Sequence, residues 1–395
     1  MTNFIYLSPN FPENHWNFVH HLKLNGINTL GIGDCEYNNL TQDLRNSLNE
    51  YYKVDSLKNY DEVYRAVAYF AHKYGRIDWL ESNNEYWLER DASLRNDFNI
   101  KSGFHIEDME KVKFKSKMKE NYIKAGIPVA RYHIVDDYEN CRRFIDEVGY
   151  PVVVKPDNGV GASDTYKLEN DDDLKYFLEH KPDVRYIMEE FITGEVQTYD
   201  AIINSKGEAL FENGNVTVAN LMETVNNKDN SCFYLRSSLP EDILDAGRRV
   251  VKAFGVKSRF VHLEFFRLTR DQYMGKNGDI VALEVNMRPS GGISPTMMNW
   301  ASGVDVYKIW ADMIAFDRSD VERYNNEVCA FASRRDGKKF ALSVEEVREK
   351  YGSIMKQEGR VEEALSGAMA DYMFIANCKN EDAARAFIID VLKSE

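Results

Sequence analysis

The stretch from Asp279 to Gly292, which reads DIVALEVNMRPSGG, constrains this chain more than any other. Its apolar run, Ile280 to Leu283, predicts a buried strand, and Glu284, Asn286 and Arg288 follow at alternating positions. A period of two places these three side chains on one face of the strand. A carboxylate, an amide and a guanidinium would each need a partner if they were buried in a core. Together they are well matched to binding a hard cation beside an anionic group. The alternative interpretation is a strand end that runs into a polar turn.

A second acidic strand is predicted upstream of this stretch. Residues Arg259 to Arg267 read RFVHLEFFR, so Glu264 lies in the middle of an aromatic and β-branched run. An ionised carboxylate there is costly unless it is paired or bound to metal. The linker to the next strand contains Gly275 and Gly278, which favours an antiparallel hairpin. We therefore expect Glu264 and Glu284 to converge on one magnesium site.

The length and composition exclude several classes of protein. The 395 residues are enough for two or three domains. The net charge of -14 is spread along the chain without a basic block, which argues against a nucleic-acid partner. The five cysteines form no C-x-x-C pair, so neither zinc binding nor a disulfide framework is suggested. No apolar run approaches the roughly 18 residues of a membrane span, and no signal-peptide pattern is present. We expect a cytoplasmic protein without a membrane partner.

Residues 1–107 alternate between strand and helix patterns and predict an α/β domain. The alternation predicts a small parallel sheet with helices on both faces. A nicotinamide-dinucleotide site is not expected, because Gly31 and Gly33 lack the third glycine of that motif. The segment Glu81 to Glu85 follows the third strand, where open α/β sheets place ligand-binding loops, although a helix N-cap is the favoured role for Ser82 or Asn83 alone. The predicted strands are 3–7, 27–32 and 77–80, and the predicted helices are 13–24, 60–73 and 85–96.

A lysine-rich segment, Asp108 to Ala125, predicts a single helix that ends at Gly126 and Pro128. Lys115 flanks the apolar stripe of this helix, and we expect the other lysines to point to solvent.

A glycine-containing loop follows the predicted strand Val152 to Val154. The strand ends in Lys155, the loop contains Gly159 and Gly161, and a second strand is predicted from Ser163 to Leu168. Flexible residues between two strands allow backbone amides to close over a phosphate, and the lysine supplies a fixed positive charge. The loop matches neither the P-loop nor the protein-kinase motif.

Three further segments complete the central region. The strand Arg185 to Met188 leads to Glu189 and Glu190, where a carboxylate could hold an adenine amino group, although an ordinary strand exit explains these residues better on sequence alone. A hairpin is predicted from Gln197 to Phe211. The segment Glu212 to Ser238 is polar and long, which predicts a binding loop.

In this order, the segments resemble the ATP-grasp superfamily, and most closely its carboxylate-amine ligase branch, which includes biotin carboxylase and carbamoyl phosphate synthetase. The resemblance covers roughly residues 1–315. It rests on Lys115 with Met118 and AGIP at 125–128, PVVVKP at 151–156 with its glycine loop, MEEFI at 188–192, Glu264, and EVNMRP at 284–289.

The resemblance implies a Rossmann-like preATP-grasp domain at residues 1–107 and an α+β ATP-grasp domain at 108–320, whose small lobe spans about 128–192. The two lobes would grip ATP between them. Helix and strand patterns in residues 321–395 predict a small C-terminal α+β cap, for which a pure packing role is equally open.

The resemblance also implies the roles of individual residues. Lys115 and Lys155 would contact the ATP phosphates, and the loop Gly159, Gly161, Ser163 would close over them. Glu189, Glu190 and Ile192 would line the adenine, and Phe266 would pack on its ring. Glu264, Glu284 and Asn286 would hold Mg²⁺, or Mn²⁺ in its place, and Arg288 would face the transferred phosphoryl group.

Two departures from the family pattern limit how far the family's residue roles apply to this chain. Many ligases of the branch carry a glutamate two residues after Gly194, where this chain has Val196, so Glu195 becomes the candidate ribose contact. The lysine-methionine signature of biotin attachment is absent, and no segment resembles a glutaminase. Carboxylation and carbamoyl phosphate synthesis are therefore not expected.

The chemistry implied is an ATP-dependent ligation of a carboxylate to an amine through an acyl phosphate, with ADP and phosphate released. Lys155 would offset the repulsion between ATP and the carboxylate, and Arg288 would stabilise the oxyanion. The alternatives are a nucleotide-binding protein without turnover and a ligase with a non-amine acceptor such as a thiol. Amino acids, peptides and small natural-product acids all remain open as substrates, and a homodimer is expected by analogy with relatives.

Overall fold

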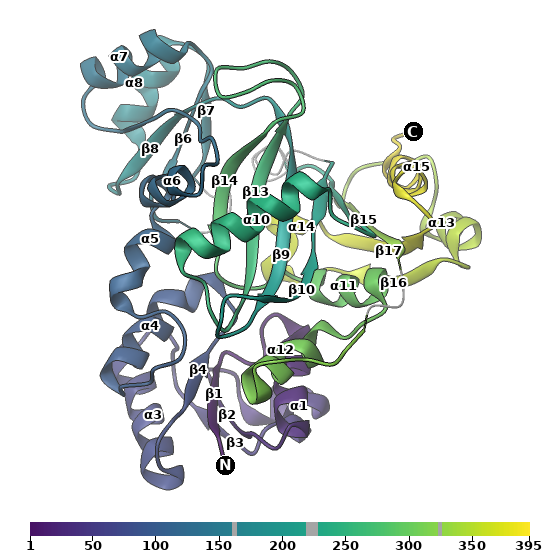
Figure 1. Ribbon diagram of the computed structural model, residues 1–395. Coiled ribbons are helices and arrows are strands. Elements are labelled where there is room, and N and C mark those ends of the chain that lie inside the picture. Colours follow the sequence, from purple (N-terminus) through teal and green to yellow (C-terminus); the bar gives the residue numbers. More distant parts are fainter. Residues whose placement is uncertain (160–163, 219–227, 323–325) are drawn as a thin grey trace.

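The structure is a computed structural model that describes residues 1–159, 164–218, 228–322 and 326–395. In these residues, the strands form a four-stranded parallel sheet, a four-stranded antiparallel sheet and a nine-stranded sheet (Figure 1). Both expected classes, α/β and α+β, are therefore present in one chain. None of the described helices combines the length and the apolar character needed to cross a bilayer.

The N-terminal sheet has the strand order β3-β2-β1-β4, and all of its pairs are parallel, as predicted. Alternate residues of β1 point to opposite faces, so Phe4 packs with α1 and Ile5 packs with α3. The sequence missed β3 and α2, which are too short to show a clear periodicity. The elements are β1 Asn3–Leu7, α1 Trp16–Leu24, β2 Asn28–Gly33, α2 Gln42–Ser47, β3 Glu50–Lys53, α3 Tyr60–Tyr74, β4 Trp79–Glu81 and α4 Leu88–Asp97.

The predicted helix over residues 108–125 is wrong, because the chain breaks at Phe114 into α5 (Met109–Lys113) and α6 (Lys115–Lys124). Phe114 is extended and forms a β-bridge with Asn158, which follows the next lobe's strand β6. A contact between residues so far apart in the chain overrides the local helix signal.

The small lobe is the antiparallel sheet β5-β8-β6-β7, covered on one face by α7 and α8 (Figure 1). Helix α7 begins after Asp137, whose side chain accepts a hydrogen bond from the backbone of Asn140. The elements are β5 Tyr132–Ile134, α7 Tyr138–Val148, β6 Val152–Pro156, β7 Tyr166–Leu168, α8 Asp171–His180 and β8 Tyr186–Glu190.

The large sheet runs in the order β14-β13-β9-β11-β12-β15-β17-β16, with β10 paired to β9. The predicted hairpin of β13 and β14 is confirmed. The prediction of one long loop over residues 212–238 is wrong, because β11 and β12 lie within it. Residues 219–227 lie outside the described chain. The elements are β9 Gly194–Ile203, β10 Ala209–Asn213, β11 Asn215–Thr217, β12 Ser231–Leu235, α10 Glu241–Phe254, β13 Arg259–Leu268, β14 Ile280–Asn286, α11 Ser294–Ser302 and α12 Val306–Phe316.

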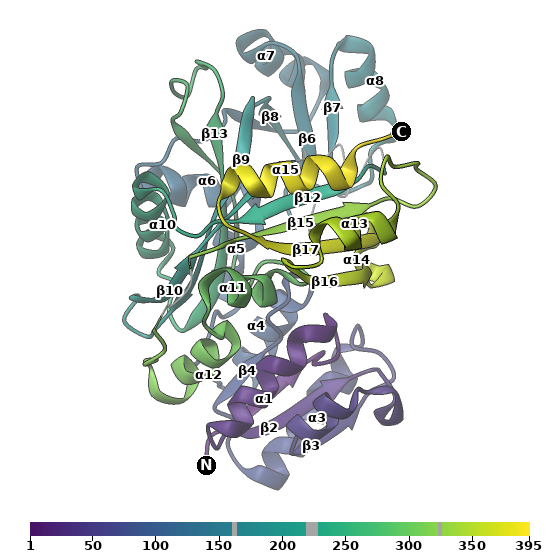
Figure 2. The same cartoon turned by 90° about the vertical axis from the view of Figure 1, so that its right-hand side faces the viewer.

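The C-terminal residues contain both helices and strands, and their strands extend the large sheet. Strand β15 pairs with β12, and β17 pairs with β15 and β16. Helix α15 lies across β12, β15 and β17 (Figure 2). The elements are β15 Val328–Arg334, α13 Val344–Tyr351, β16 Met355–Arg360, α14 Glu363–Met369, β17 Tyr372–Cys378 and α15 Glu381–Leu392.

A buried group of charged residues, the junction cluster of Glu81, Asp91, Arg95 and Arg259, joins the N-terminal domain to β13. Arg95 donates to the Leu80 carbonyl and to Glu81 Oε2, at 2.7 and 2.9 Å. Arg259 also donates to Glu81. Burial and the neighbouring Glu81 raise the pKa of Asp91 to about 8. The cluster fixes the start of β13 against the end of β4.

Candidate active site

Two carboxylates meet on one face of the β13–β14 hairpin. Glu264 lies directly opposite Glu284, and His262 lies opposite Asn286. Directly paired residues share a face of a sheet, so the structure brings Glu264, Glu284 and Asn286 together. The side chains of Glu264 and Glu284 are 20% and 18% exposed, which leaves both open to a ligand.

Lys115 reaches this face from the first residue of α6. Its Nζ lies 3.0 Å from Glu284 Oε1 and donates to the Gly159 carbonyl at 3.3 Å. The start of α6 is fixed to the end of β6, because the Lys115 backbone N–H donates to the Asp157 carbonyl at 2.8 Å. Burial acts to lower the pKa of Lys115, but Glu284 and other carboxylates outweigh it and the pKa is raised. Lys115 is therefore a fixed cation.

Lys155 lies in a second charged group, in the small lobe. Glu189 forms ion pairs with Lys119 and Lys155, whose Nζ atoms lie 2.9 and 3.0 Å from its carboxylate oxygens. Burial acts to raise the pKa of Glu189, but the two lysines outweigh it and lower the pKa to about 2. The expectation that Lys119 points to solvent is wrong, since it is buried. Its position four residues after Lys115 places both lysines on one helix face, a signal that the sequence contained.

An apolar patch lies beside these charges, where an adenine ring is expected. Ile192 and Phe266 belong to one cluster, with Ile192 buried and Phe266 partly buried. Glu190 is bound by Arg131, whose Nε and Nη2 lie 3.0 and 2.6 Å from Glu190 Oε2. Arg131 in turn lies over the ring of Tyr273. The cluster is completed by Ala130, Leu268, Val281 and the partly buried Met274.

Arg288 lies between the face that carries Glu264 and Glu284 and the N-terminal domain. Its Nη2 donates to Asn286 Oδ1 at 3.1 Å, and its Nε lies 3.8 Å from Glu85 Oε2. Within the described chain, Glu85 Oε2, Asn83 Nδ2 and Ser290 Oγ are buried without a hydrogen-bond partner. Buried polar groups normally have partners, so Glu85 Oε2 favours a polar ligand beside Arg288, while Glu85 Oε1 is already bound by Lys113 Nζ at 2.9 Å. The sequence marked residues 81–85 as a ligand loop but gave Glu85 no role.

Asp200 and His262 form a pair that the sequence did not reveal. His262 Nδ1 lies 2.7 Å from Asp200 Oδ1, and its Nε2 lies 3.0 Å from Glu264 Oε1. Burial acts to lower the pKa of His262, but Asp200 and Glu264 outweigh it and raise the pKa to about 9. The imidazole therefore donates from both nitrogens at neutral pH.

The structure does not bring every predicted residue together. Glu195 pairs with Arg267 and Val196 with Phe266, so Glu195 faces away from the Phe266 side of the sheet. Glu195 Oε1 instead accepts from Arg385 at 2.9 Å. Gly161 and Ser163 lie outside the described residues.

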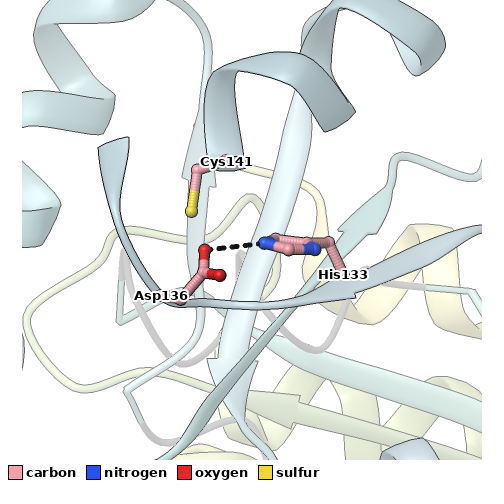
Figure 3. Close-up of side chains that lie close together, drawn as sticks. All are labelled: His133, Asp136 and Cys141. Atoms are coloured by element: carbon pink, nitrogen blue, oxygen red, sulfur yellow. Dashed lines mark hydrogen bonds and ion pairs between the residues drawn. The ribbon is translucent and has the colours of Figure 1, made fainter. Parts of the chain in front are cut away.

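Another group of potential metal ligands, His133, Asp136 and Cys141, lies in the small lobe (Figure 3). His133 and Asp136 already bond to each other at 2.9 Å. Burial raises the pKa of Cys141, which disfavours the thiolate that binds metals. The oxygen donors of Glu264, Glu284 and Asn286 are the better match to magnesium.

A family model described as "ATP-grasp domain" matches residues 109–292, from α5 to the turn after Arg288. This segment belongs to the ATP-grasp family. Lys115, Lys155, Glu264, Glu284 and Arg288 all lie inside the matched ATP-grasp segment.

Curated relatives share this region at low identity. The carbamoyl phosphate synthase large chain of Methanothermobacter thermautotrophicus is 24% identical over 220 residues, which cover 53% of this chain and 19% of the relative. The L-arginine-specific L-amino acid ligase of Bacillus subtilis is 26% identical over 230 residues, which cover 56% of this chain and 53% of the relative. The chain therefore spans only part of the length of either relative.

Solved structures share the fold over nearly the whole chain. An L-amino acid ligase from Bacillus licheniformis has a TM-score of 0.71 at 14% identity, covering 98% of this chain and 96% of that one. N5-carboxyaminoimidazole ribonucleotide synthetase from Thermotoga maritima has a TM-score of 0.65 at 17% identity, with full coverage of both chains. The predicted ATP-grasp architecture is thereby confirmed.

Proposed function

We propose that this protein is an ATP-dependent ligase that joins a carboxylate to an amine through an acyl phosphate. The observation that carries the proposal is the convergence of Glu264, Glu284 and Asn286 on one face, with Lys115 and Arg288 at its margins. A protein that only binds a nucleotide does not need two metal-binding carboxylates beside an arginine. The family match and the names of the relatives support the same reaction class.

The donor set fits a divalent cation. Glu264 and Glu284 supply carboxylate oxygens, and Asn286 supplies an amide oxygen, as Mg²⁺ and Mn²⁺ prefer. When bound, the metal ion would neutralise phosphate charge during phosphoryl transfer. Lys115 and Lys155 would bind the phosphates, with Gly159, Gly161 and Ser163 closing over them. Glu189, Glu190, Ile192 and Phe266 would surround the adenine.

Arg288 would act on the substrate rather than on ATP alone. Its guanidinium would hold the carboxylate against repulsion from the γ-phosphate and would then stabilise the oxyanion when the amine attacks. Lys155 would act on the phosphate side of the same step. Lys155 is buried and Arg288 is only 18% exposed, so both would limit the access of water to the acyl phosphate.

We further propose an amino acid as one substrate. Glu85 Oε2 lacks a hydrogen-bond partner and would accept from an ammonium group, while Arg288 and Asn83 Nδ2 would bind a carboxylate. The L-amino acid ligases among the relatives support this class. A cytoplasmic location and a homodimer are part of the same proposal.

The test is release of ADP and phosphate with Mg²⁺ and ATP across pairs of amino acids and other acids with amines. Release that requires both substrates, and that Glu284→Ala abolishes, supports the ligase. Glu120→Ala, which changes an exposed carboxylate paired with Lys117, is the matched control and should keep full activity.

Hydroxylamine separates the competing outcomes, because it traps an acyl phosphate as a hydroxamate without any amine acceptor. A hydroxamate without amide formation would point to a non-amine acceptor. ATP binding without hydroxamate or release for any acid would contradict the ligase and favour a nucleotide-binding protein.

A further inference from the structure

A row of hydrogen bonds that runs from Asp200 through His262 holds the carboxylate of Glu264. Asp200 Oδ1 lies 2.7 Å from His262 Nδ1, and His262 Nε2 lies 3.0 Å from Glu264 Oε1. The three residues share one face of β9 and β13, because Asp200 pairs with His262 and Glu264 lies two residues further. The row therefore points along the sheet toward the carboxylate pair.

The far end of the row is anchored to the backbone. Thr198 Oγ1 donates to Asp200 Oδ2 at 2.5 Å and accepts from the Asn215 backbone N–H at 2.9 Å. Asp200 is fully buried and His262 is 7% exposed, so neither side chain has room to turn. His262 is thus held from one side and has its other nitrogen aimed at Glu264.

The two carboxylates are held in matching ways. Glu264 Oε1 is bound by His262, and Glu284 Oε1 lies 3.0 Å from Lys115 Nζ. Neither second oxygen, Oε2 of Glu264 or of Glu284, has a hydrogen bond to any described residue. A ligand held by one oxygen presents the other in a fixed direction, which is how hydrogen bonds behind a metal site orient its ligands.

We propose that His262, itself held by Asp200, is a positioning residue that fixes Glu264 so that Oε2 is presented to the divalent cation. The inference rests on the proposed function, because it takes Glu264 as a metal ligand. His262 acts through Glu264 and does not touch ATP or the substrate. The expected signature is a loss of metal affinity without a loss of nucleotide affinity.

The test measures Mn²⁺ binding by electron paramagnetic resonance in the presence of ADP, which needs no turnover. His262→Phe keeps the ring volume and removes the donor, so Mn²⁺ affinity should fall about 10- to 100-fold. His262→Gln keeps an amide donor and should recover most of the loss. Asp200→Asn weakens the hold on His262 and should lower Mn²⁺ affinity as well, by about 10-fold. In activity assays, the Mg²⁺ concentration for half-maximal rate should rise in the same order.

His133→Phe is the matched control, because His133 also bonds a carboxylate, Asp136, at 2.9 Å but lies in the small lobe (Figure 3). It should leave Mn²⁺ affinity unchanged. Metal-free ADP binding and circular dichroism should match the wild type in every variant that is compared. If His262→Phe does not fold, Asp200→Asn decides the question.

Mn²⁺ affinity within about twofold of the wild type in folded His262→Phe and Asp200→Asn would overturn the inference. An equal loss in His133→Phe would also overturn it. Failure of the ligase proposal would give a different result. The Mn²⁺ affinities of the variants would then follow the predicted order, but no acid would give a hydroxamate.

Discussion

The junction cluster and the active-site face both gather charged side chains around β13, but they differ in how far those side chains are exposed. In the junction cluster, Arg95 is fully buried and Glu81 is bound by two arginines. On the active-site face, Glu264 and Glu284 remain about one-fifth exposed, and each has one oxygen without a hydrogen bond among the described residues. A set of charges that is sealed from solvent fixes the fold, whereas a partly exposed set leaves room for a ligand.

The largest expected effect is the loss of the junction cluster. Arg259→Met leaves Glu81 with one arginine and should lower the free energy of unfolding by about 3–5 kcal/mol, because a buried charge loses its partner. Urea denaturation measures the change. Arg360→Met is the control, since Arg360 pairs with Asp336 on the exposed surface, and it should cost at most about 1 kcal/mol. Equal losses of unfolding free energy in the two variants would contradict the contrast between the buried junction cluster and an exposed ion pair.

Arg288→Ala should instead damage turnover and leave stability nearly intact. Loss of an oxyanion-stabilising donor should lower kcat about 10²- to 10³-fold, or about 2.7–4 kcal/mol. Steady-state ADP release measures the change, with urea denaturation alongside. Arg248→Ala, at an exposed position on α10, should retain wild-type kcat. A variant that loses stability and activity together would place Arg288 with the junction cluster.

Lys119→Met should have a smaller effect, confined to nucleotide binding. Without Lys119, Glu189 draws Lys155 more strongly and makes it less available to phosphate. The KM for ATP should rise about 10-fold, equivalent to about 1.4 kcal/mol, with kcat less affected. Lys117→Met removes an exposed lysine of the same helix and should leave the KM unchanged. A fall in kcat alone would show that Lys119 does not act through ATP binding.

Asp91→Asn should change the free energy of unfolding least at acidic pH. The change should grow as the pH rises. The folded pKa of Asp91, about 8, lies above its ordinary value of 3.8. Its contribution to stability is therefore complete below about pH 4 and is lost as the pH rises toward 8. Asn imitates the protonated acid, so the variant should match the wild type below about pH 4 and exceed its stability near pH 8. If the stability of the wild type and of the variant changed with pH in parallel, the raised pKa of Asp91 would be contradicted.

The side chains that the sequence placed correctly lie on one strand or one hairpin. The alternation of Glu284, Asn286 and Arg288 is local, and it is enough to predict their shared face. The pairs that were missed join distant residues, such as Asp200 with His262 and Glu81 with Arg259, which no local pattern reports.

The fold shows the same division between local and distant signals. Alternating helix and strand patterns were enough to predict three of the four strands of the N-terminal sheet, all but β3. Strands β11 and β12 were missed because short strands gain their stability from neighbours supplied elsewhere in the chain. The helix break at Phe114 was hidden for the same reason, since Asn158 lies in another lobe.

The position of β15 in the large sheet has a consequence for synthesis of the chain. Strand β12 pairs with β11 on one side and β15 on the other, yet β13, β14, α11 and α12 all separate β12 from β15 in the sequence. On the ribosome, one edge of β12 therefore stays without its partner until nearly the whole protein has emerged. Open strand edges recruit other chains, so the newly made polypeptide passes through an aggregation-prone stage that the finished molecule no longer shows.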